Sequence, residues 1–185
     1  MKIISLWQPW SSLMALGAKR IETRSWGTSY RGPLVIHAAK AWNRDCQDSL
    51  YIQPMMKALE PIIGAHSAQF WAQYALAVRG RLPFGAIIAV VNLIDCCPTV
   101  DTVSTKATII PAEPSAFTKY PQLDTPRERA FGNYEPGRWA WVTNHLRVLS
   151  EPLPFKGGQG LRDLDPAVAA EVIRRMPHSE VNIWQ

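Results

Sequence analysis

The segment "FGAIIAVVNLIDCC" at residues 84–97 constrains the fold most, because it is a long run of apolar and β-branched residues. Such a run is typical of a strand that is buried on both of its faces. We therefore expect residues 84–97 to form the central strand of a sheet.

The first forty residues predict a β-α-β-β unit. Residues 2–6 alternate in the manner of a strand, and Pro9 suits the first turn of a helix that ends at Gly17. The segments "KRIETRSW" (19–26) and "GPLVIHAA" (32–39) predict two further strands, joined by the turn "GTSYRG".

The rest of the chain predicts helices, a long loop and one more long strand. Residues 43–80 are expected to form a helical insertion of two or three short helices, broken at prolines and a glycine. Residues 98–136 are rich in Pro, Thr and charge and predict a long loop, with one helical turn near 125–130. Residues 137–149 alternate like a strand, and a final helix is expected at 165–175, capped by an aspartate.

These elements predict one domain over residues 1–185, in the α+β class. Strands with non-local pairing and helices at one end favour a small mixed β-barrel, closed or half-closed. A chain of 185 residues with 47% hydrophobic content is sufficient for one packed core.

The composition narrows the function classes. No run of about eighteen apolar residues occurs, and the first residues do not have the pattern of a signal peptide, so we expect a cytoplasmic protein without membrane association. The three cysteines include an adjacent pair and show no CxxC spacing, so we expect no disulfide, no metal and no cofactor.

The charge and the aromatic content point to a polyanionic partner. Lys and Arg outnumber Asp and Glu by 20 to 15, although these charges are spread along the chain. The chain also has eight tryptophans, and aromatic faces beside arginines are surfaces on which unstacked bases pack.

The stretch "GAKRIETRSW" holds the best candidate site. With a period of two, Glu22, Arg24 and Trp26 share one face of the expected strand. Lys19 follows the turn at Gly17 and can reach the same pocket. Such a cluster can form an internal ion-pair network, bind an anion or carry out acid/base chemistry, and the charge pattern leaves these alternatives open.

These residues resemble the ASCH domain family. Its hallmark G-x-K-x-x-E-x-R is matched here by Gly17, Lys19, Glu22 and Arg24. The similarity spans about residues 3–40, resumes at 85–96 in the "NLIDC" strand, and returns at 139–142.

The resemblance implies a PUA-like barrel with a cleft beside the first helix, in a superfamily that binds RNA or modified bases. Lys19, Glu22 and Arg24 would line that cleft. Some bacterial relatives are amidohydrolases that remove an acyl group from acetylated cytidine, and others are reported as ribonucleases. The amidohydrolases use a threonine nucleophile where this chain has Glu22, so the chain departs from that branch.

Our leading hypothesis is a binding module for nucleic acid, namely RNA, a single strand or also DNA, or for a modified nucleotide. Lys19 and Arg24 would contact phosphate or a base edge, Glu22 would orient them or bind an exocyclic amine, and Trp26 would stack on a base. The alternative is a hydrolase of a modified nucleoside, a base or RNA, with Glu22 as the base and Lys19 stabilising an oxyanion. A third hypothesis is a protein-interaction domain that uses the helical insertion.

Further residues could extend the basic, aromatic-lined cleft. Lys40 could contact a phosphate, and Arg138 with Trp139 could supply a guanidinium and a stacking plane. His37 is expected to be a hydrogen-bonded structural residue. The segment "KGGQGLRD" (156–163) lacks the spacing of a phosphate-binding loop, and a tight turn explains it.

Overall fold

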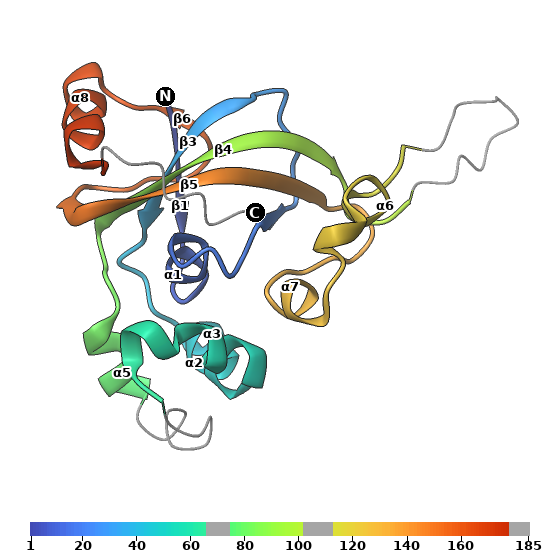
Figure 1. Ribbon diagram of the computed structural model, residues 1–185, viewed down its shortest axis with the longest axis horizontal. Coiled ribbons are helices and arrows are strands. Elements are labelled where there is room, and N and C mark those ends of the chain that lie inside the picture. The colour runs from blue at the N-terminus through green and yellow to red at the C-terminus, as the bar shows by residue number, and fades with distance from the viewer. Residues whose placement is uncertain (66–74, 102–112, 178–185) are drawn as a thin grey trace, which may run out of the picture.

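A mixed six-stranded half-barrel sheet forms the centre of the molecule (Figure 1). The computed structural model describes residues 1–65, 75–101 and 113–177. The strands are β1 (Lys2–Leu6), β2 (Ile21–Arg24), β3 (Gly32–Ala38), β4 (Ala86–Pro98), β5 (Trp139–Pro154) and β6 (Arg162–Asp163). Their order in the sheet is β2-β5-β4-β3-β1-β6. β1 pairs with β3 in parallel, and the other neighbours are antiparallel.

The strands β4 and β5 are the long interior strands of this sheet. β4 is buried along most of its length, as its apolar sequence predicts. The β-α-β-β unit expected in the first forty residues is also confirmed, and the helix before β2 ends at Gly17 with a φ of 70°.

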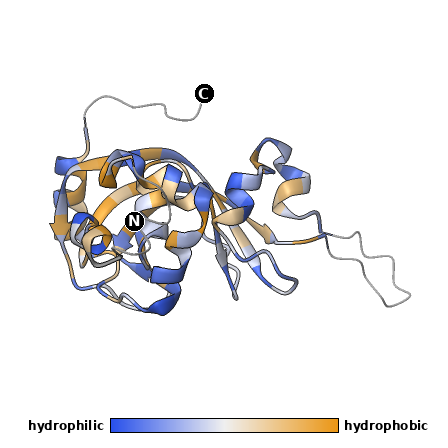
Figure 2. Cartoon of the chain, turned by 90° about the horizontal axis from the view of Figure 1, so that it is seen from below, coloured by the Kyte–Doolittle hydropathy of each residue, from blue (hydrophilic) through white to orange (hydrophobic). Residues whose placement is uncertain are grey.

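Both faces of the sheet are covered. Along β1, Ile4 and Leu6 pack in one apolar cluster with Met14, whereas Ile3 packs on the other face with Val172. This division follows from the period of two in a strand. In Figure 2 the hydrophobic colour is concentrated along the strands, which agrees with a sheet buried on both sides.

The helices lie around the sheet. They are α1 (Trp10–Ala15), α2 (Arg44–Asp48), η1 (Ser49–Tyr51), α3 (Gln53–Ile63), α5 (Ala75–Arg81), α6 (Ala116–Lys119), η2 (Pro121–Leu123), α7 (Pro126–Ala130) and α8 (Pro166–Arg175). α1, α2, α3 and α5 lie below the sheet in Figure 1, and α8 lies on the opposite side. The region expected to be a helical insertion contains α2, η1, α3 and α5, and residues 66–74 lie outside the described residues.

The segment expected to be a long loop contains more helix than the sequence predicts. α7 matches the helical turn expected near 125–130, but α6 and η2 were not expected. α6 is too short to show a helical period, and it is stabilised by Ser115, whose Oγ accepts a hydrogen bond from the Thr118 amide. Phe117 and Leu123 then pack against the sheet. Residues 102–112 of this segment lie outside the described residues.

The end of the chain follows the sequence prediction. Asp165 caps α8 by accepting hydrogen bonds from the amides of Ala167 and Val168, and Pro166 is the first helical residue. Across the described residues, no helix has the length and apolar character that crossing a membrane requires.

Candidate functional site

Strand β2 carries the motif and presents its polar side chains on one face. Ile21 and Thr23 are buried on one side, and Glu22 and Arg24 lie on the other, as the period of two predicts. Glu22 Oε1 lies 3.1 Å from Arg24 Nε. Arg24 Nη2 donates a hydrogen bond of 3.0 Å to the Ser5 carbonyl, so this guanidinium is held from two sides.

Lys19 is buried beneath that face. Its side chain is 1% exposed, and Nζ donates to the carbonyls of Ile21 at 2.6 Å and Phe131 at 2.9 Å. Nζ also lies 3.5 Å from Glu22 Oε2. Lys19 therefore ties β2 to the segment after α7 and holds Glu22 in place. Both side chains line a small cavity of about 340 Å³.

Glu128 of α7 completes this buried cluster. Its carboxylate accepts hydrogen bonds of 2.9 Å from the amides of both Arg20 and Ile21. Burial raises the pKa of Glu128, and the nearby Lys19 ammonium is the strongest opposing influence. The sequence did not single out Glu128, although Thr125 three residues earlier forms a capping-box spacing with it. That spacing predicts the start of α7 but not the contact of the carboxylate with β2.

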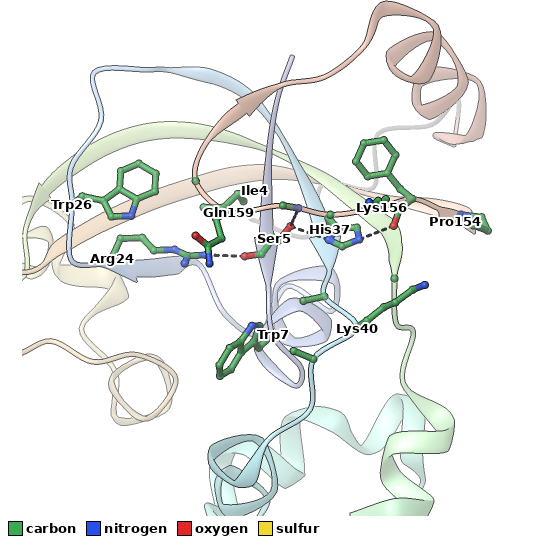
Figure 3. A pocket seen from close by; sticks show the side chains of 17 residues that line it. Ile4, Ser5, Trp7, Arg24, Trp26, His37, Lys40, Pro154, Lys156 and Gln159 are labelled. Carbon is green, nitrogen blue, oxygen red and sulfur yellow. Dashed lines mark hydrogen bonds between the residues drawn. The ribbon is translucent and has the colours of Figure 1, made fainter.

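The main cavity, of about 1000 Å³, lies among β1, the end of β3 and the loop that follows β5 (Figure 3). Its charged and aromatic lining combines Arg24, Lys40 and Lys156 with Trp7 and Trp26. Trp7 is 44% exposed, which is unusual for a tryptophan. The lining is therefore both basic and aromatic.

The loop 156–160 closes one side of this cavity over Ser5 and His37. His37 is 2% exposed and hydrogen-bonded at both nitrogens, as expected. Nδ1 lies 3.0 Å from Ser5 Oγ, and Nε2 lies 3.0 Å from the Phe155 carbonyl oxygen. Burial is the main cause that lowers the pKa of His37, and the charge of Arg162 lowers it further.

The structure separates the residues predicted for the site into three groups. Arg24, Trp26 and Lys40 line the main cavity. Lys19 and Glu22 line the small cavity, while Glu22 and Arg24 together border a third cavity of about 310 Å³ that also includes Trp7. The motif thus links neighbouring cavities through Glu22 and Arg24.

Arg138 and Trp139 lie outside the lining of the main cavity. Arg138 donates from Nε to the Asn133 carbonyl and from Nη2 to the Thr23 carbonyl, which fixes the chain beside β2. Trp139 pairs with Arg24 in the β-ladder, and its ring lies against Gly27.

Sequence reasoning did not assign Trp7, Ser5 or Lys156 to the site. Trp7 directly follows β1, and Trp10 lies close to it in the sequence. The one signal for Trp7 in the sequence is its position just beyond the end of the strand. Ser5 and Lys156 are more than 150 residues apart in the chain, and no local pattern indicates that they meet. In the described part of the chain, no group of three or more His, Cys, Asp or Glu side chains is placed to hold a metal ion.

The half-barrel and its flanking helices define a PUA-like α+β protein with a basic, aromatic cavity beside β1 and the end of β3. The model of the ASCH domain family matches residues 4–144, and the chain therefore belongs to the ASCH domain family. This family is generally one of RNA-binding domains.

Two relatives are similar in sequence to half of this chain. Activating signal cointegrator 1 of Homo sapiens is 36% identical over 93 residues, and that of Mus musculus is 34% identical over 93 residues. Each match covers 50% of this chain and 14% of the relative. The matched part is thus a small fraction of the relatives' length.

Proposed function

We propose that this protein binds RNA, another single-stranded nucleic acid or a modified nucleotide through the main cavity. The observation that carries the proposal is the combination of three cationic side chains with two tryptophans in one space of about 1000 Å³. Cations neutralise phosphates, and aromatic faces stack on unpaired bases. A cavity of this composition suits a ligand that has both a phosphate and an unpaired base.

Arg24 supports this proposal because its guanidinium is preorganised. Glu22 and the Ser5 carbonyl hold Nε and Nη2, at 3.1 and 3.0 Å. A fixed guanidinium loses little side-chain entropy when it binds a phosphate or a base edge. Trp26 lies close to Arg24 in Figure 3, so a base and its phosphate could be bound side by side.

Lys19 and Glu22 act in this proposal by positioning Arg24. The contacts run from Lys19 Nζ to Glu22 Oε2 at 3.5 Å, and from Glu22 Oε1 to Arg24 Nε at 3.1 Å. Both carboxylate oxygens of Glu22 thus face a cation. This arrangement favours an orienting role over that of a free base for hydrolysis, which is why we place binding first.

The test is binding of fluorescent single-stranded RNA and DNA oligonucleotides, measured by anisotropy over a series of salt concentrations. We expect the logarithm of the association constant to fall with the logarithm of salt, by about 0.7 per neutralised phosphate. Trp7→Ala should weaken binding by about 1–3 kcal/mol if a base stacks there. Lys156→Ala should reduce the salt slope by about 0.7.

Matched controls are Arg127→Ala on α7 and Tyr51→Ala on η1. Both side chains are exposed and lie outside the lining of the main cavity. We expect these variants to bind like the wild type. Equal weakening by cavity and control variants, or no binding of either nucleic acid at low salt, would show that the proposal is wrong.

A further inference from the structure

The loop 156–160 lies directly on Ser5 and His37. A Cβ atom built on Gly157 would lie 2.2 Å from His37 Cε1 and 2.8 Å from Ser5 Oγ, so only glycine fits there. The Gly158 amide donates a hydrogen bond of 3.3 Å to Ser5 Oγ. Among the described residues, no acceptor takes a hydrogen bond from the amides of Gly157, Gln159 or Gly160. These three residues also line the cavity.

The hydrogen-bond partners determine where the protons of the Ser5–His37 pair lie. The Phe155 carbonyl can only accept, so His37 Nε2 carries the proton of that bond. In the neutral imidazole, Nδ1 then accepts from the Ser5 hydroxyl. Ser5 Oγ in turn accepts from the Gly158 amide. The single hydroxyl proton of Ser5 thus points at His37 and away from the cavity.

Protonation of His37 reverses this arrangement. Both imidazole nitrogens become donors, so Nδ1 donates to Ser5 Oγ. Ser5 Oγ then accepts from His37 and from the Gly158 amide, and its own proton is free to point into the cavity. The loop side of the cavity gains a positive charge and a hydroxyl donor in one step.

We infer that the loop 156–160, together with Ser5, His37, Lys40 and Lys156, forms a phosphate-binding subsite whose occupation is coupled to proton uptake by His37. The inference rests on the proposed function, because it assigns the phosphate of that ligand to the loop end and the base to the end with Trp7 and Trp26. The donors are the loop amides, the two lysines and the Ser5 hydroxyl of the protonated state.

The charges around His37 give the direction of the coupling. Arg162 from β6 acts on it directly, and Arg24, Lys40 and Lys156 line the same cavity. No carboxylate occurs among the described residues that line this cavity. Burial and the charge of Arg162 oppose protonation of His37, whereas an anion bound in the cavity would favour it. Anion binding should therefore raise the His37 pKa, and by linkage a lower pH should strengthen anion binding.

The probe is sulfate, which stays a dianion over the range in which histidine titrates. Calorimetric titrations of the full chain near pH 6, in two buffers with different heats of protonation, should show proton uptake on binding. We expect sulfate affinity to rise about three- to tenfold between pH 7.5 and pH 5.5, because a shift of one pKa unit corresponds to a factor of ten. In H37Q, which keeps a donor and an acceptor but cannot be protonated, this rise should vanish.

The control is H145Q, because His145 is exposed on β5 and lies outside the cavity lining. This variant should keep the pH dependence of the wild type. Nuclear magnetic resonance of the wild-type imidazole gives an independent readout, which does not require a variant to fold. We expect a neutral tautomer protonated at Nε2 and a His37 pKa that rises when sulfate is added.

Two oligonucleotides of one sequence, with a 5′-phosphate or a 5′-hydroxyl, identify the source of the phosphate. Tighter binding of the phosphorylated form below pH 6 indicates a terminal phosphate, and equal pH-dependent binding indicates the backbone; either result supports the subsite. Absence of sulfate binding, or an unchanged His37 pKa in its presence, overturns it. RNA binding that is independent of pH and of His37 would refute this inference while leaving the proposed function intact.

Discussion

At the scale of single residues, the sequence predicted how Glu22 and Arg24 of the motif are oriented, but it did not predict the burial of Lys19. The period of two correctly placed Glu22 and Arg24 on one face. The burial of Lys19 could not be predicted, because its partners Phe131 and Glu128 come from more than 100 residues further along the chain. Only the fold brings these groups together.

Replacement of Lys19 should therefore reduce stability more than its place in a surface-like motif suggests. In Lys19→Met, the two carbonyls lose their donor, and Glu128 loses the cation that compensates its buried carboxylate. We expect the free energy of unfolding, measured with urea, to fall by about 3–5 kcal/mol, as when one partner of a buried pair is removed.

Lys40→Met is the matched control for this measurement. Lys40 is exposed at the end of β3, so its replacement should leave the free energy of unfolding nearly unchanged. A loss of similar size in both variants would contradict the structural role of Lys19.

At the scale of elements, the sequence predicted helix ends that are set by residues at those ends, such as a capping side chain or a glycine. The cap at Asp165 and the glycine at position 17 were both found in the sequence. The loop 156–160 shows the opposite case. In the sequence its glycines resemble those of any tight turn. The close contact that excludes a side chain at position 157 is with His37, which lies on a strand far away in the sequence.

Gly157→Ala tests this contact. The added methyl group would overlap His37 and Ser5, so the loop or the imidazole must move. We expect a loss of about 1–3 kcal/mol in the free energy of unfolding, typical of overpacking, together with weaker RNA binding. Gly80→Ala is the control, because a Cβ there has no neighbour within 4 Å and α5 should tolerate it or gain slightly. Equal effects of the two substitutions would argue against a close loop contact.

At the scale of the whole molecule, the sequence indicated a mixed barrel but not its strand order. The pairing of β2 with β5, and of β1 with β3 in parallel, depends on contacts between distant segments. The basic, aromatic character of the site was predicted from composition and from the motif. The position of the main cavity was not predicted, because the loop after β5 forms one of its walls.

His37 contributes to the pH dependence of global stability, because it joins β1, β3 and the chain after β5. Its pKa is lowered in the folded state, so below about pH 6.5 the imidazole of His37 binds a proton more readily in the unfolded chain than in the folded protein. The contribution of His37 is complete above that pH and is lost as the pH falls toward the lowered pKa. Urea unfolding at pH 7.5 and pH 5.5, without added anions, should show a smaller loss of stability in H37Q than in the wild type. A loss of equal size in the two proteins would contradict this role.

The strand order of the sheet also bears on self-association. An unpaired strand at the edge of a sheet offers its backbone groups to other chains and can seed aggregation. The longest strands, β4 and β5, are interior here, and the edge strands β2 and β6 have only 4 and 2 residues. β2 pairs only with residues 139–142 of β5, however, so among the described strands the remainder of β5 keeps an uncovered edge on that side. We expect an intruding chain to pair there, and Pro152 and Pro154 limit this pairing because proline has no backbone N–H to donate.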